Sequence, residues 1–195
     1  MNIHSILCQS ILLRLAKTGL TGLLLIFTSA LQAEEVLVPE PWPAPAPPFH
    51  LQDLKGSYRH LGDYRGQVLI VNFWASWCQP CRQELPALNR ASAALEQDGV
   101  ALLAVNLGEE SEAVEAFLND FPIDFPVLID QRGIYSQRWG VRALPTTFVL
   151  NPRGEIVYRI LGEKVWDDPS LLAQVRELAP RRAKKLQGLP AIGQP

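Results

Sequence analysis

Two of the chain's three cysteines, Cys78 and Cys81, are separated by two residues in the segment WCQPC. Such a pair can form a structural disulfide, supply half of a metal site, or cycle as a redox couple. A structural disulfide that closes so short a loop would constrain little of the unfolded chain. A metal site usually takes four ligands, but the sequence has no second CxxC, and His50 and His60 lie far upstream. The spacing therefore favours a redox pair.

The neighbouring residues predict different roles for the two cysteines. Before them lies an apolar run at 67–75, which is typical of a strand buried on both faces. From Cys81 on, residues 81–97 show the periodicity of a helix. A cysteine where a helix begins meets unpaired backbone N–H groups and the positive end of the helix dipole, which favour the thiolate. We therefore expect Cys78 to be the nucleophile. Cys81, one turn into the helix, would attack a mixed disulfide at Cys78 and release the partner.

Two further residues are candidates for the same site. Glu84 lies three residues after Cys81, so both would face the same side of a helix. A carboxylate beside a buried thiol can take and return its proton, but the spacing fits a solvated helix carboxylate equally well. In ALPTTF, Pro145 stands immediately before a predicted strand. Either a cis Leu144–Pro145 bond serves a turn there, or a trans proline opens an edge strand.

The elements that would position these residues alternate along the chain. A short hairpin around the Lys55-Gly56 turn comes first. Apolar strands then alternate with helices, which predicts an α/β fold with a mixed central sheet covered by helices on both faces. The predicted strands span 67–75, 100–108, 125–130, 146–151 and 155–162, and the predicted helices span 81–97, 111–121, 133–140 and 170–178.

The N-terminal segment, 1–33, predicts export from the cytoplasm. An uncharged apolar stretch at 20–31 follows two basic residues. At about a dozen residues it is short for a membrane-spanning helix and typical of a signal-peptide core. Cleavage after Ala33, or after Ala30, is one possibility, and an uncleaved membrane anchor is the other. Cleavage would also remove Cys8.

Three further segments complete the predicted organisation. Six prolines in 34–48 indicate an extended linker, either a tether or a docking ligand. A single folded domain is expected at 49–180, and 181–195 reads as a basic flexible tail with at most a weak attraction to anionic surfaces. The net charge of −2 gives no nucleic-acid footprint.

The segments VNFWASWCQPCRQELPAL and ALPTTFVLNPRGEIV resemble the thioredoxin superfamily. More narrowly, they are similar to the exported thiol-disulfide oxidoreductases of the TlpA/ResA type, over about residues 49–178. This resemblance implies a thioredoxin fold in which the first hairpin is an N-terminal extension. The stretch at 108–130 resembles the strand–helix insertion of this subfamily.

The resemblance also assigns roles. It implies that Cys78 and Cys81 form the redox disulfide and that a cis Pro145 lies beside the sulfurs. Glu84 matches the acid of the family, three residues after the second cysteine. Cytoplasmic thioredoxins carry a buried Asp where this chain has Asn72, so proton handling is expected to fall to Glu84.

Aromatic and backbone groups complete the expected site. Trp77 is expected to cover the disulfide and contact the substrate, and the backbone at Leu144 and Pro145 to pair with the partner's chain. Trp139 and Trp166 are interpreted as packing residues only.

The resulting hypothesis is an extracytoplasmic thiol-disulfide oxidoreductase that reduces disulfides in a client protein. It is expected to act as a monomer without organic cofactor or metal, and the resemblance implies a membrane-embedded thiol donor that recharges it. A cytochrome c maturation reductase is the nearest alternative, although its proline segment often differs from RALPTT. A thiol peroxidase would need a Thr/Pro-rich pocket that FWASWC lacks, and a copper chaperone a histidine after His60.

Overall fold

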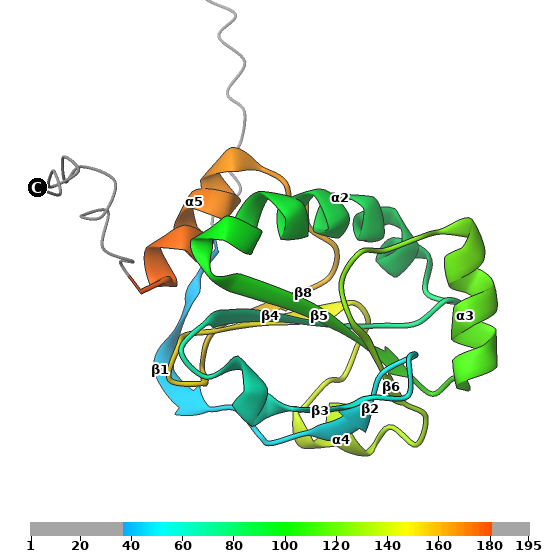
Figure 1. Cartoon of the computed structure of the whole chain (residues 1–195). Helices are drawn as coiled ribbons and strands as arrows, with labels where there is room; N and C mark the ends of the chain where they lie inside the picture. Colours follow the sequence, from blue (N-terminus) through cyan, green and yellow to red (C-terminus); the bar gives the residue numbers. More distant parts are fainter. Residues whose placement is uncertain (1–36, 181–195) are drawn as a thin grey trace, which may run out of the picture. The chain divides into compact units, whose positions relative to one another are not determined.

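The centre of the protein is a mixed six-stranded sheet, seen in a computed structural model that describes residues 37–180 (Figure 1). Its strands are β1 (Pro39–Pro45), β4 (Val68–Trp74), β5 (Val100–Leu107), β6 (Val127–Asp130), β7 (Thr146–Leu150) and β8 (Glu155–Leu161). They lie in the order β1-β8-β7-β4-β5-β6. The pairs β4–β5 and β5–β6 are parallel, and the other neighbouring strands are antiparallel. This is the mixed α/β sheet predicted from the sequence.

The central strand β4 is buried along its whole length, which explains its unbroken apolar sequence. One of its faces packs against α2 (Gln79–Leu95), α3 (Ser111–Asp120) and α5 (Pro169–Leu178). The opposite face packs against α4 (Ile134–Arg138), a 3-10 turn η2 (Leu61–Tyr64) and the first hairpin. Figure 1 shows the sheet between these two layers. A second 3-10 turn, η3 (Glu96–Asp98), ends α2.

The N-terminal hairpin and the strand–helix insertion are both present. Strands β2 (His50–Gln52) and β3 (Tyr58–His60) pair antiparallel and form a separate two-stranded sheet. The turn between them contains Gly56 at φ +80°, a backbone conformation that glycine adopts without strain. The insertion consists of α3 followed by β6, which extends the parallel side of the sheet.

The proline-rich segment differs from the expectation of a linker at 34–48. Residues 39–45 form β1, an edge strand that pairs with β8 through an irregular register. Alternating prolines have no N–H to donate, but an edge strand needs only one side paired, so prolines fit there. The folded domain therefore begins before residue 49.

The two ends of the chain, 1–33 and 181–195, lie outside the described residues. The interpretation of 1–33 as a signal peptide or anchor therefore stays a prediction, and so does that of 181–195 as a basic tail. Within 37–180, no helix is both long enough and apolar enough to cross a bilayer.

Candidate active site

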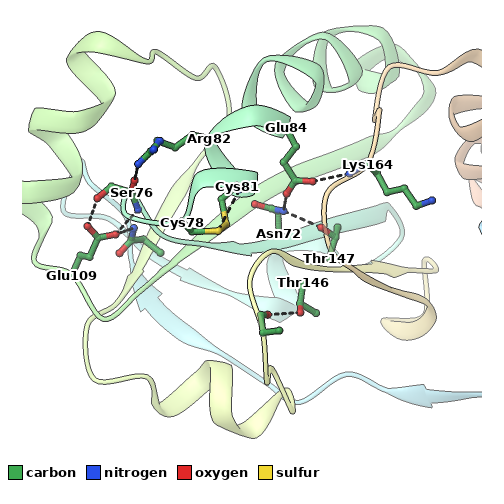
Figure 2. The surroundings of a disulfide bond; sticks show 12 residues. Asn72, Ser76, Cys78, Cys81, Arg82, Glu84, Glu109, Thr146, Thr147 and Lys164 are labelled. Atoms are coloured by element: carbon green, nitrogen blue, oxygen red, sulfur yellow. Dashed lines mark hydrogen bonds between the residues drawn. A yellow bond between two sulfur atoms is a disulfide. The ribbon is translucent and has the colours of Figure 1, made fainter.

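The two cysteines occupy the turn between β4 and α2. Cys78 is the N-cap residue of α2, and its sulfur accepts a hydrogen bond from the Cys81 backbone N–H at 3.3 Å. Pro80 lies in the first turn of the helix, where its missing N–H leaves no gap in the hydrogen bonding. The two sulfurs are joined in a disulfide of 2.06 Å (Figure 2). The structure thus brings together the pair that the sequence singled out.

The two sulfurs differ in access and surroundings. Cys78 is 6% exposed and Cys81 is fully buried. The N-terminus of a 17-residue helix places its unpaired N–H groups and positive dipole end at Cys78. Both features stabilise negative charge on that sulfur in the reduced protein, so Cys78 is the sulfur suited to attack an external disulfide.

Glu84 lies on α2 with only 2% of its surface exposed, so it is not a solvated carboxylate. Its Oε1 accepts a 2.7 Å hydrogen bond from Asn72 Nδ2, and its Oε2 accepts one from the Lys164 backbone N–H at 3.2 Å (Figure 2). Burial raises the pKa of Glu84 from 4.5 to about 7, although these hydrogen bonds oppose the change. A carboxyl group with a pKa near neutrality can both donate and accept a proton.

Asn72 and Trp166 hold this carboxyl group from two other elements. Asn72 on β4 also donates to Thr147 Oγ1 on β7 at 2.9 Å, so its amide links the sheet to α2. Trp166, in the segment between β8 and α5, donates from Nε1 to Glu84 Oε2 at 3.1 Å. The interpretation of Trp166 as packing only was therefore incomplete. No local pattern signals this bond, because its two residues are 82 positions apart.

A second polar network holds the turn just before Cys78, and the sequence reasoning missed it. Ser76 donates to the carboxylate of Glu109 through its backbone N–H at 2.7 Å and through its hydroxyl group. Asn106 Nδ2 donates to the same carboxylate at 2.7 Å, and Arg82 donates to the Ser76 carbonyl at 2.8 Å. In Figure 2 the disulfide lies between this network and the one around Glu84.

The position of Glu109 offered a usable signal. It stands two residues after the end of β5, and β5 is parallel to and paired with β4. Because the carboxyl ends of adjacent parallel strands meet at one edge of the sheet, polar residues after β5 should lie close to those after β4.

An open groove of about 510 Å³ lies in front of Cys78. Its lining residues are Trp77, Cys78, Pro80, Leu107, Val141, Arg142, Ala143 and Leu144. Trp77 is 66% exposed and lines this groove together with Cys78. Cys78 can therefore be approached through this groove.

The Leu144–Pro145 peptide bond is cis, the geometry that the family resemblance implied. The carbonyls on either side of Leu144 are occupied: that of Ala143 accepts from Thr146 Oγ1, and that of Pro145 from the Gly162 N–H. Leu144 itself makes no hydrogen bond through its N–H or C=O within residues 37–180. Its backbone can therefore pair with a bound extended chain.

Within the part of the chain that the structure describes, no cluster of three or more His, Cys, Asp or Glu side chains could hold a metal ion. Histidines 50 and 60 lie on the first hairpin, where their rings stack on each other with centroids 4.1 Å apart. The structure does not bring them to the cysteine pair.

Comparison with known proteins places these features in a family. The model of the AhpC/TSA family matches residues 43–159. The thiol-disulfide oxidoreductase ResA of Geobacillus kaustophilus is 41% identical over 123 residues, which cover 63% of this chain and 71% of that protein. ResA of Bacillus subtilis is 37% identical over 117 residues, covering 60% of this chain and 65% of that one.

Solved structures show the same similarity. A protein from Chlorobium tepidum, assigned as the thiol:disulfide interchange protein DsbE, matches 73% of this chain and 99% of its own, with 31% identity and a TM-score of 0.65. StoA from Bacillus subtilis matches 70% of this chain and 98% of its own, with 30% identity and a TM-score of 0.57.

Proposed function

Since the chain belongs to the AhpC/TSA family and has the thioredoxin fold, we propose that it is an extracytoplasmic thiol-disulfide oxidoreductase that reduces disulfides in client proteins. The observation that carries the proposal is the asymmetric cysteine pair. Cys78 faces an open groove from a helix N-terminus, and Cys81 is buried one turn behind it.

The proposed reaction uses the pair in two steps. In the reduced protein, the Cys78 thiolate attacks one sulfur of a client disulfide and forms a mixed disulfide, while the other client sulfur leaves as a thiolate. Cys81 then attacks the Cys78 sulfur, which restores the internal disulfide and releases the second client thiolate. The cysteines carry both electrons, so the reaction needs no metal or organic cofactor.

Glu84 is proposed to serve the second step. Cys81 is fully buried, so its thiol must lose a proton before it can attack, and water cannot take that proton directly. Glu84 lies one helical turn away on the same face of α2, and its pKa of about 7 allows it to accept the proton at neutral pH.

The groove supports binding of the client as an extended chain. The free N–H and C=O of Leu144 would pair with the client backbone next to its cysteine, while Trp77 and Leu144 would contact client side chains. Pro145, with its buried ring and cis bond, would hold Leu144 in position.

The cellular setting is part of the same proposal. The apolar stretch at 20–31 supports export, either with cleavage of residues 1–33 or with their retention as an anchor. A reductase in an oxidising compartment must be recharged, so a membrane-embedded thiol donor is proposed as a second partner. We propose that the protein acts as a monomer, since a thiol-exchange site open to two partners in turn needs no second copy.

The decisive experiment compares two variants with a protein that contains accessible disulfides, such as insulin. Cys81→Ser should accumulate a mixed disulfide through Cys78 that dithiothreitol reverses, and Cys78→Ser should form none. If both variants form the adduct equally, the assigned roles are wrong. A reduction potential near about −120 mV, the value of a strong oxidant, would instead indicate an oxidase.

The nearest alternative, a reductase for cytochrome c maturation, uses the same chemistry and differs only in its client. The Cys81→Ser adduct tests it, because mass spectrometry of the adduct identifies the trapped protein.

A further inference from the structure

The groove in front of Cys78 is apolar apart from one charge. Among the described residues that line it, Arg142 alone carries a charged side chain, and the others, Trp77, Pro80, Leu107, Val141, Ala143 and Leu144, present mainly apolar surface around the sulfur. Arg142 is exposed and precedes by two residues the free backbone of Leu144. A cation thus stands beside the position where the client chain would pair.

The guanidinium of Arg142 has no partner within residues 37–180, which distinguishes it from other arginines near the site. Arg82 donates to the Ser76 carbonyl, and Arg138 lies over the ring of Tyr135. The carboxylate of Glu109, two residues after Leu107, is held by other donors. Arg142 is therefore available to a bound molecule.

We propose that Arg142 selects clients that carry an acidic residue close to the cysteine to be reduced. The inference rests on the proposed function, because it assumes that the groove receives the client. Arginine suits this task, since its guanidinium is always charged and presents several donors to a carboxylate. The apolar lining would bind the uncharged residues of the same segment.

The size of the groove limits how far the acidic residue lies from the cysteine. A volume of 510 Å³ corresponds to a sphere roughly 10 Å across, and an extended chain spans about 3.3–3.6 Å per residue. Cys78 and Arg142 line the same groove, so an acidic residue within about three positions of the client cysteine can reach the guanidinium.

The expected preference is modest. Exposed ion pairs stabilise a complex enough to change a rate by about two- to five-fold, and salt weakens them. A client with an acidic residue should therefore react about two- to five-fold faster than a neutral one, and a basic client more slowly. The difference should shrink as ionic strength rises.

The test uses two sets of three synthetic peptides with one cysteine each. The peptides of a set differ only in having Glu, Gln or Lys two residues before the cysteine in one set, or two residues after it in the other. Each cysteine is joined in a mixed disulfide to 4-thiopyridine, an uncharged leaving group. Reduced protein attacks the peptide sulfur through Cys78 and releases thiopyridone, which is followed by its ultraviolet absorbance. Cys81 then displaces the peptide thiol and forms the internal disulfide. The second-order rate constants are measured by stopped flow for both placements of the variable residue, before and after the cysteine.

The charge-swapped variant Arg142→Glu should reverse the order of the three peptides, so that the Lys peptide reacts fastest. Lys55→Glu is the control for the same change in net charge, because Lys55 is exposed in the β2–β3 turn and does not line the groove. This control should retain the preference for the Glu peptide.

Equal rates for the three peptides with the natural protein, or an unchanged order in Arg142→Glu, would overturn the inference and leave the proposed function in place. Failure of the proposed function would look different. The reduced protein would then react with none of the peptides faster than dithiothreitol at the same thiol concentration.

Discussion

The buried carboxyl group of Glu84 makes a quantitative prediction for the pH dependence of stability. In the unfolded chain its pKa is near 4.5, and in the folded protein it is about 7, because burial disfavours the charged form. The folded state therefore binds this proton more tightly. The resulting stabilisation is fully present below pH 4.5 and is lost as pH rises to about 7.

The size of the effect follows from the two pKa values. Each unit of difference corresponds to about 1.36 kcal/mol, so the whole change is about 3 kcal/mol. Between pH 5 and pH 8, the titration of Glu84 should lower the free energy of unfolding by about 2–3 kcal/mol. That loss is a sizeable part of the stability of a domain of this size.

The substitution Glu84→Gln isolates this contribution, since glutamine keeps the shape of the side chain and does not titrate. Asn72 Oδ1 is buried and has no hydrogen-bond partner among residues 37–180. When the Asn72 amide turns over, the new amide N–H of the glutamine can donate to this oxygen. The variant should therefore fold, and its stability should change less between pH 5 and pH 8, by about 2–3 kcal/mol.

The assay is urea unfolding of the oxidised protein at pH 5, 6, 7 and 8, followed by tryptophan fluorescence and far-UV circular dichroism. All other titrating groups are common to both proteins, so the difference between the two pH profiles reports on Glu84. Glu115→Gln, an exposed carboxylate on α3, is the matched control and should follow the natural protein. Parallel profiles for the natural protein and Glu84→Gln would refute the reasoning.

Three further outcomes follow from the site. Trp166→Phe removes a donor that lowers the pKa of Glu84, so the midpoint of the pH–stability profile should rise by about one pH unit; an unchanged midpoint would contradict this. Glu109→Ala should lower the free energy of unfolding by about 2 kcal/mol, because it leaves the buried Asn106 amide and the half-buried Ser76 N–H without this acceptor; a loss below about 0.5 kcal/mol would mean that the turn before the cysteines holds without it. In the reduced protein, iodoacetamide at pH 7 should label Cys78 before Cys81, as peptide mapping can show, and the reverse order would overturn the assignment of the nucleophile.

The local part of the site could be predicted from the sequence because its signals are contiguous. An apolar run, a CxxC and a segment of helical periodicity follow one another, so they predict a buried strand, a helix start and a nucleophilic first cysteine. The spacing of Cys81 and Glu84 placed both on one face of that helix. These inferences need only the periodicity of single elements.

The edge strand β1 could not be predicted from the sequence. Its prolines predicted a linker, because the composition of a segment indicates only its own conformational preference. Composition does not show that another strand will lie beside it. Only the unpaired edge of β8 allows residues 39–45 to join the sheet.

The chain's own order of residues thus determined the fold class, the redox pair and the difference between its two cysteines. The tertiary structure alone decided which groups surround that pair: Trp166 at the Glu84 carboxyl, Glu109 at Ser76, and Arg142 at the rim of the groove. The physical reason is distance along the chain. A hydrogen bond that lowers the pKa of a carboxyl group acts over about 3 Å in space. Sequence periodicity does not show that two residues 82 positions apart will meet.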